Sequence, residues 1–363
     1  MKVGVPKETA AGETRVALVP EIIRKLTAKD FEVAVQPGAG EGSMLADAVY
    51  EEAGATISED VWSADVVVKV AAPSDDEIAK LGKDTVLIGF LGPLSNPKTT
   101  QALADAGATA FAMEAIPRIS RAQSMDALSS QSNVAGYKSV LVATNHLGRF
   151  LPMMMTAAGT VPPAKVLVLG AGVAGLQAIA TARRLGAQVT GYDVRSAVAE
   201  QVQSLGAQFL ELEAGKGAEG EGGYARELTD EENQAQQQEL ADKIATFDVV
   251  ITTALVPGRP APRLVTAESV EKMKAGSVIV DLAGETGGNC ELTEPGQTVV
   301  KHDVTIASPL NLPATMPEHA SELYSKNITA LLDLLIKDGK LAPDFTDEVI
   351  AESCVTRTQG ESA

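Results

Sequence analysis

Lys165-Val166-Leu167-Val168-Leu169-Gly170-Ala171-Gly172-Val173-Ala174-Gly175 is the stretch that decides the fold. Its apolar run predicts a buried parallel strand, and the glycines at 170, 172 and 175 follow with the spacing GxGxxG. In a dinucleotide-binding turn the first glycine permits a tight turn and the second lets a pyrophosphate approach. The third lets the helix pack on the strand. The stretch therefore predicts a Rossmann-type turn that holds phosphates at a helix N-terminus.

The residues after the turn support a dinucleotide ligand. A helix is expected through Leu185, and a second strand ends at Asp193, about 20 residues after the turn, where a carboxylate accepts hydrogen bonds from ribose hydroxyls. The same carboxylate repels a 2′-phosphate, which favours NAD over NADP. Arg195 offers the opposite possibility, because a guanidinium can bind a 2′-phosphate. We give Asp193 the greater weight, since glycines alone mark turns in many loops.

Length and composition predict two α/β domains. The chain has 363 residues, 45% of them hydrophobic and only 4% aromatic, as is typical of parallel sheets packed between helices. A helix expected from Ser129 to His146 leads into the second domain. We expect two Rossmann-like domains with parallel sheets, residues 1–128 plus 312–363 and residues 129–311, with NAD in the cleft between them.

Alternating short β-rich runs and helical patterns give the expected elements. In the first domain these are residues 2–5, 21–28, 32–36, 47–53, 64–70, 85–91, 97–106 and 108–112. In the second, strands are expected near residues 165–169, 188–192, 207–210, 248–252, 277–281 and 305–306. Residues 152–163 and the glycine-rich 211–238 are expected to be loops, the latter mobile. A last helix, 320–337, is expected to pack on the first domain.

Charge and cysteine content exclude several classes of function. A formal net charge of -18 argues against nucleic acid and against anionic lipid as a partner. Cys290 and Cys354 lack metal-ligand spacing, so we expect inert thiols and no metal site. No basic leader precedes the first strand, and no run approaches the roughly 18 apolar residues that a bilayer span needs. We expect a soluble, cytoplasmic chain without direct membrane insertion.

Two further segments follow no general physical template. They are Pro117-Arg118-Ile119-Ser120-Arg121-Ala122-Gln123-Ser124-Met125-Asp126 and the run from Pro152 to Ala164. They resemble the NAD(H)-binding component, domain I of the alpha subunit, of the proton-translocating NAD(P) transhydrogenases. The resemblance extends over nearly the whole chain through residues 170–187, 222–225, 251–258, 287–290 and 354–357.

The resemblance implies direct hydride transfer between NADH on this chain and NADP(H) on a partner subunit, coupled to proton translocation by a membrane subunit. It also implies a homodimer at the cytoplasmic side of the inner membrane. The residues implied at the nicotinamide end are Arg118, Gln123, Ser124, Met125, Asp126 and Ser129, of which Arg118, Gln123 and Asp126 are implied to be catalytic. Guanidinium and carboxamide groups suit the nicotinamide carboxamide and ribose.

The resemblance also implies the rest of the binding site. Val173, Asp193, Val194 and Arg195 surround the adenosine half, and Leu255 lies beside the nicotinamide half. Gly223, Tyr224 and Gln236 match a mobile loop that folds over the bound nucleotide. Tyr224 stands alone in a polar, glycine-rich stretch, where a lid role is natural.

The rival hypothesis is an alanine dehydrogenase, a relative that residues 2–8 and 15–20 also resemble. Arg15 and Lys69 match the pair that holds a substrate carboxylate in those enzymes. Amino acid oxidation, however, needs a general acid or base. The relative's histidine is Phe90 here, and its Asp-containing segment reads Gly284-Glu285-Thr286-Gly287-Gly288.

The three histidines, His146, His302 and His319, are each expected to be structural or exposed rather than catalytic. Exchange of hydride between two nicotinamides requires no protein acid or base, so their absence from the predicted site fits transhydrogenation. Arg15 and Lys69 are then expected to be ion-pair or cleft residues. A third hypothesis is a non-catalytic NAD(H) sensor that closes the Tyr224 loop onto a partner.

Overall fold

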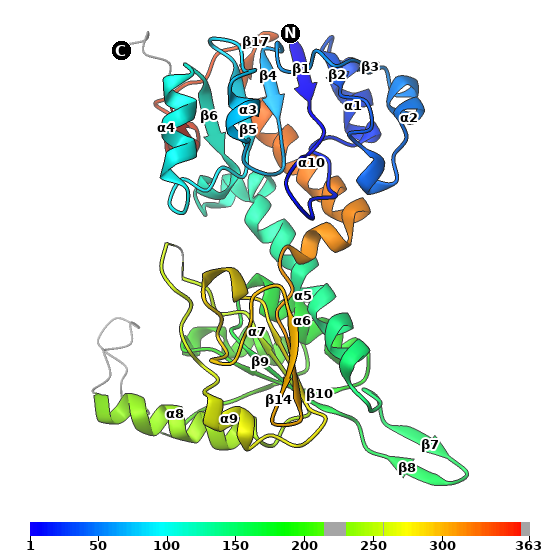
Figure 1. Cartoon of the computed structure of the whole chain (residues 1–363), viewed down its shortest axis with the longest axis vertical. Coiled ribbons are helices and arrows are strands. Elements are labelled where there is room, and N and C mark those ends of the chain that lie inside the picture. The colour runs from blue at the N-terminus through cyan, green and yellow to red at the C-terminus, as the bar shows by residue number, and fades with distance from the viewer. Residues whose placement is uncertain (214–229, 257, 357–363) are drawn as a thin grey trace. The chain divides into compact units, whose positions relative to one another are not determined.

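The computed structural model describes residues 1–213, 230–256 and 258–356 and divides into two compact units (Figure 1). Unit 1 comprises Met1–Gln131 and Pro313–Ala363, and unit 2 comprises Ser132–Leu312. The helix expected to end at His146 is α5, Ala127–His146, which leaves unit 1 and enters unit 2. None of the described helices is long and apolar enough to cross a membrane.

Unit 1 is built on a seven-stranded sheet in the order β18-β6-β5-β4-β1-β2-β3. Its strands are β1 (Lys2–Val5), β2 (Glu32–Val35), β3 (Thr56–Ile57), β4 (Val66–Val68), β5 (Val86–Gly89), β6 (Thr109–Ala112) and β18 (Cys354–Thr356). All neighbours pair in parallel except β18, which runs antiparallel to β6. Valine dominates these strands, as expected for a sheet covered on both faces.

Helices cover this sheet, and the one that returns from the C-terminal segment is the longest of them. They are α1 (Pro20–Thr27), α2 (Asp47–Glu52), α3 (Asp75–Ile78), α4 (Pro97–Asp105), α10 (Pro317–Leu335) and α11 (Glu348–Ser353). Tyr324, Ile328 and Leu331 of α10 lie fully buried in the same core as the valines of β1 and β4. The predicted packing of the last helix on the first unit is therefore confirmed.

Unit 2 contains a second seven-stranded sheet, in the order β11-β10-β9-β12-β13-β15-β14. Its strands are β9 (Lys165–Leu169), β10 (Gln188–Tyr192), β11 (Gln208–Phe209), β12 (Val249–Thr252), β13 (Val278–Asp281), β14 (Thr298–Lys301) and β15 (Val304–Ala307). Its further helices are α6 (Val173–Arg184), α7 (Ala199–Ser204), α8 (Asp230–Ile244) and α9 (Ala267–Glu271). Only β14 is antiparallel to its neighbour among these described strands.

The parallel strands of both units follow the same order, third-second-first-fourth-fifth-sixth, which is the doubly wound arrangement of dinucleotide-binding folds. The predicted class, α/β with two Rossmann-like units and parallel sheets, is confirmed. Shorter elements complete the chain: η1 (Glu41–Ser43), η2 (Met113–Ala115), η3 (Ser120–Met125), η4 (Ser196–Val198), η5 (Gly284–Thr286), η6 (Leu312–Thr315) and the two-residue strands β16 (Ile336–Lys337) and β17 (Lys340–Leu341).

The predicted loop over residues 211–238 is wrong in its last segment, because α8 begins at Asp230. Glu, Gln and Ala at 231–238 are good helix formers. The apolar side chains that anchor the helix, Leu240, Ala241 and Ile244, lie beyond the polar segment. Residues 214–229 of the predicted loop lie outside the described residues.

Several short strands were also not predicted. The expected loop over residues 152–163 contains an exposed hairpin of β7 (Met154–Thr156) and β8 (Gly159–Val161), visible as the long ribbon of unit 2 in Figure 1. The antiparallel edge strands β14 and β18 have four and three residues. Short strands on the edge of a sheet lack a strong hydrophobic pattern, so the sequence carries little signal for them.

We expect Gly175→Ala to destabilise unit 2. A Cβ at Gly175 would lie 1.8 Å from the carbonyl oxygen of Gly170, so helix or turn must shift, at a cost of about 2 kcal/mol or more. Gly172→Ala is the matched control, because a Cβ there meets nothing within 4 Å. Urea unfolding followed by circular dichroism measures both variants. Equal stability of Gly175→Ala and the wild type would contradict the packing described.

Candidate functional site at the carboxyl edge of the unit 2 sheet

The glycine turn leaves open space at the start of α6. The backbone N–H of Gly170, with φ of +101°, donates to Tyr192 O over 2.8 Å, which holds the turn against β10. The first bond of the helix runs from Leu176 N–H to Gly172 O over 2.8 Å. Because the first-turn N–H groups of a helix lack partners within it, this end presents donors toward the open side of Gly172.

Asp193, which follows β10 directly, is tied to the glycine turn. Its Oδ2 accepts from Ala171 N–H (2.8 Å) and Arg195 Nη2 (3.0 Å), and its Oδ1 accepts from Arg195 N–H and Nε (both 2.9 Å). Partial burial of Asp193 opposes ionisation. The hydrogen bonds from Arg195 and Ala171 outweigh it and hold the pKa of Asp193 below its ordinary value. Asp193 is thus an ionised acceptor beside the turn.

Large apolar side chains are exposed along the same edge. Val173, Val194, Leu255 and Leu310 follow the carboxyl ends of the parallel strands β9, β10, β12 and β15. Their exposed fractions are 41%, 70%, 56% and 43%. Since carboxyl ends of parallel strands meet at one edge, these side chains line the place where doubly wound sheets bind ligands. Exposed apolar groups gathered in this way indicate a binding surface.

A buried polar network supports this edge from below, and the sequence analysis missed it. Asn289 is fully buried, its Oδ1 accepts from Ala254 N–H (3.1 Å), and its Nδ2 donates to Ala254 O and Pro262 O (both 2.8 Å). Asp281, fully buried at the end of β13, accepts four hydrogen bonds. A charged residue at the end of the run Val278-Ile279-Val280 was the signal that could have revealed it.

The predicted nicotinamide loop lies in unit 1 and forms η3. Arg118, Gln123 and Ser124 are exposed, whereas Met125 is packed in the hydrophobic core of unit 1. Asp126 accepts from the backbone N–H of Ser129 (2.9 Å) and from its hydroxyl (2.6 Å), so it caps α5. The structure therefore brings Asp126 and Ser129 together and leaves Arg118 and Gln123 toward solvent.

Two anchors that the sequence analysis also missed hold this loop from within unit 1. Asn327 of α10 donates to the backbone carbonyl of Ser124 over 2.8 Å. Arg121 forms a bidentate ion pair with Asp347, at 2.7 and 2.9 Å. These contacts fix the backbone of η3 and so determine where the exposed side chains start.

The remaining predicted site residues belong to the lid. Gly223 and Tyr224 lie outside the described residues. Gln236 belongs to α8.

The two cations expected to hold a substrate carboxylate pair instead with buried carboxylates of unit 1. Arg15 pairs with Glu13, at 2.6 Å between Nη2 and Oε2, and donates to Gln131 Oε1 over 2.8 Å. Lys69 is 1% exposed and lies 3.1 Å from Glu8 and 3.2 Å from Glu77. Burial raises the pKa of Glu8, although Lys69 opposes this. Both cations are therefore paired and desolvated inside the unit, as expected for ion-pair residues.

No proton carrier stands where the relative has one. The ring of Phe90 packs against Tyr324, with centroids 5.2 Å apart. Glu285 is exposed on η5, and both His302 and His319 are exposed away from the strand ends that carry the site.

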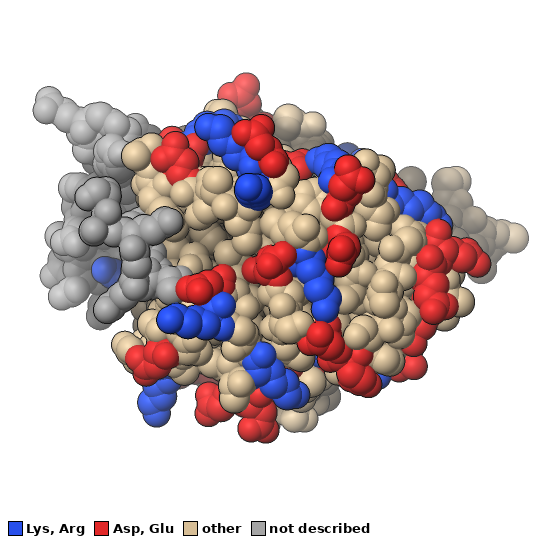
Figure 2. Space-filling model, turned by 90° about the horizontal axis from the view of Figure 1, so that it is seen from above, with Lys and Arg blue, Asp and Glu red and all other residues tan. Residues whose placement is uncertain are grey.

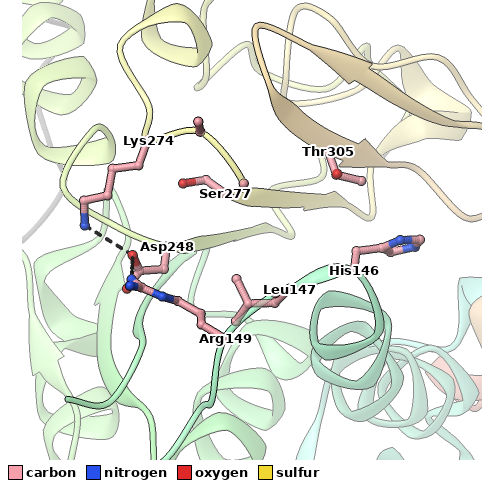
Figure 3. A pocket seen from close by; sticks show the side chains of 10 residues that line it. His146, Leu147, Arg149, Asp248, Lys274, Ser277 and Thr305 are labelled. Atoms are coloured by element: carbon pink, nitrogen blue, oxygen red, sulfur yellow. Dashed lines mark hydrogen bonds and ion pairs between the residues drawn. The ribbon is translucent and has the colours of Figure 1, made fainter. Parts of the chain in front are cut away.

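A hollow of unit 2 with charged walls lies at the opposite, amino edge of the sheet (Figure 3). It has a volume of about 370 Å³ and is lined by His146, Arg149, Asp248, Lys274 and Ser277 among others. Asp248 accepts from Lys165 N–H and pairs with both Arg149 and Lys274. These contacts hold its pKa below the ordinary value against its burial. Because the carboxylate engages both cations, this hollow has structural charges.

Charge elsewhere is mixed. Figure 2 shows Lys and Arg interspersed with Asp and Glu over one face, with no broad basic patch on the described residues there. Among the described residues no group of three or more His, Cys, Asp or Glu is placed to hold a metal ion.

These observations define a two-domain α/β protein of the doubly wound class. The chain belongs to the alanine dehydrogenase/PNT family, since residues 4–135 match its N-terminal domain and residues 139–361 its C-terminal domain. It is 50% identical to an NAD(P) transhydrogenase alpha subunit of Rhodospirillum rubrum, over 98% of this chain and 96% of the relative. The predicted relationship to transhydrogenase alpha subunits is thereby confirmed.

Two solved structures agree. A transhydrogenase from Sinorhizobium meliloti superposes with a TM-score of 0.86 at 45% identity, covering 99% of this chain and 98% of that one. An L-alanine dehydrogenase superposes with a TM-score of 0.84 at 30% identity, covering 99% and 96%. Fold similarity is nearly equal for the two, so the residues of the site have to distinguish their functions.

We expect Cys290 to be unreactive in the folded protein. Burial, reinforced by the negative charge of Asp281, raises the pKa of its thiol to about 11. At pH 8 only about one thiol in a thousand is then ionised. In a Cys354→Ser background, a disulfide reagent such as DTNB should leave the native protein unlabelled and modify one thiol in urea. Rapid labelling without urea would contradict the burial.

Proposed function

We propose that this chain is the NAD(H)-binding subunit of a proton-translocating transhydrogenase. In this function, hydride passes directly between its NADH and NADP⁺ on a partner subunit. The observation that carries the proposal is the carboxyl edge of the unit 2 sheet, where an open glycine turn, an ionised carboxylate and exposed apolar side chains occur together. The names of the transhydrogenase relatives support the same activity.

Asp193 is proposed to accept the hydroxyls of the adenosine ribose. Among the described residues, its hydrogen bonds apart from that of Ala171 come from Arg195, whose side chain is 61% exposed and can rotate into solvent. The ribose hydroxyls would replace the guanidinium, and Arg195 would then cover the adenosine together with Val173 and Val194. A 2′-phosphate would meet the carboxylate at close range, so NAD(H) is preferred over NADP(H).

The nicotinamide end is proposed to be held by the η3 loop and Leu255. Arg118 and Gln123 are its exposed hydrogen-bonding side chains, while Asp126 sets their position by capping α5. Catalysis is positional: the C4–H bond of NADH breaks with both electrons, and a C–H bond forms at C4 of NADP⁺. A near-attack distance of roughly 3 to 3.5 Å is required, and no proton is exchanged with the protein.

Amino acid oxidation is the weaker proposal. It requires a base and an available cation for the substrate carboxylate. Phe90 packs against Tyr324, and Lys69 is buried between two glutamates. Homodimer formation, docking with the NADP(H)-binding and proton-conducting subunits, and a place at the cytoplasmic side of the membrane are proposals that rest on the family resemblance.

The decisive assay mixes the purified chain with an NADP(H)-binding partner subunit and follows hydride transfer from NADH to NADP⁺. Transfer should occur, and a parallel assay with alanine and NAD⁺ should give no oxidation. Alanine oxidation without transfer would overturn the proposal. Tight NADH binding with neither reaction would favour the sensor.

Asp193→Asn should weaken NADH binding roughly ten-fold or more, because it removes the charge from the ribose acceptor. Fluorescence titration with NADH measures the dissociation constant. Glu200→Gln, which makes the same charge change on an exposed residue of α7, is the control and should bind as the wild type does. Unchanged affinity of Asp193→Asn would exclude it as the ribose ligand.

A further inference from the structure

Asp281 is a buried anion whose partners are hydrogen-bond donors. Its Oδ1 accepts from Thr252 Oγ1 and from Ala283 N–H, both over 2.9 Å. Its Oδ2 accepts from Cys290 N–H over 2.9 Å and from Thr293 Oγ1 over 2.6 Å. Each oxygen thus receives a backbone N–H, which can only donate, and this arrangement favours the carboxylate form.

This charge has no counterion in the described ranges. Within residues 1–213, 230–256 and 258–356, no Lys or Arg forms an ion pair with Asp281, and its side chain is fully buried. Asp248, a second buried carboxylate of this sheet, is neutralised by Arg149 and Lys274. Asp281 therefore keeps a net negative field in a region of low dielectric.

The field is centred beneath the loop that carries Leu255. Thr252, a direct partner of Asp281, ends β12 three residues before Leu255. Cys290, another partner, follows Asn289, which binds both the N–H and the carbonyl of Ala254. Rigid hydrogen bonds thus connect Asp281 to the residue next to Leu255, at the carboxyl edge of adjacent strands.

We propose that Asp281 tunes the nicotinamide redox couple by favouring NAD⁺ over NADH at this site. The inference rests on the proposed function, in which the nicotinamide half lies over Leu255. The ring carries a positive charge in NAD⁺ and none in NADH, so a fixed anion below it stabilises only the oxidised form. When the C4–H bond of NADH breaks with its electron pair, positive charge develops on the ring. Asp281 therefore makes bound NADH a stronger hydride donor.

The test is the ratio of dissociation constants, Kd(NAD⁺)/Kd(NADH), measured by calorimetry on the whole chain. Asp281→Asn removes the charge at nearly constant size, and the ratio should rise roughly ten-fold, as Coulomb's law gives for ~10 Å at an effective dielectric constant of ~20. Thr293→Lys is the second variant, because Thr293 touches Oδ2 and is only partly buried. Its ammonium group would neutralise Asp281 in place, and the ratio should rise again.

Asp248→Asn is the matched control, a buried carboxylate at the amino edge of the same sheet, and should leave the ratio as it is. A ratio within two-fold of the wild type in whichever of the two test variants folds would overturn the inference, as would an equal rise in Asp248→Asn. A general loosening of the fold would weaken both nucleotides alike and leave the ratio unmoved. A wild-type chain that binds neither nucleotide would overturn the proposed function as well, whereas binding with an insensitive ratio would overturn this inference alone.

Discussion

The close approach of α6 to the turn before it is the constraint on which the unit 2 edge depends. A methyl group at Gly175 would lie 1.8 Å from Gly170 O, and one at Gly136 of α5 would lie 2.1 Å from Ala174 O. Two backbone contacts without side chains therefore hold the first turn of α6 between β9 and α5. Because the backbone is so confined, its N–H groups point at one place without further ordering.

The two units share a strand order but use their carboxyl edges differently. In unit 2, β9 runs into glycines that leave room for a ligand. In unit 1, β1 runs into Pro6-Lys7-Glu8, and Glu8 accepts from Val70 N–H and pairs with Lys69. The place where unit 1 could bind a ligand is thus filled by its own buried ions. This explains how one fold, repeated, yields a single glycine-turn site in the described chain.

Charge placement distinguishes the two edges of the unit 2 sheet. At the amino edge Asp248 is balanced by two cations, so the charges stabilise local structure. At the carboxyl edge Asp281 is satisfied by hydrogen bonds from neighbouring donors, and Asp193 is held by a guanidinium that is largely exposed. The negative charges that are available to a ligand lie where the proposed nucleotide binds, while the positive end of α6 faces the phosphates.

Sequence alone determined the elements with strong local signals: the strand and glycine turn at 165–175, the position of Asp193 after the second strand and the apolar face of α10. It failed for α8, whose anchoring side chains follow a polar segment, and for short edge strands, whose pairing is not local. Only the tertiary structure revealed that Lys69 and Arg15 are already paired, that Asp126 caps α5 and that Asp281 lacks a counterion among the described residues. Such properties depend on which distant residues surround a charge, because burial and hydrogen-bond partners exist only once the chain is folded.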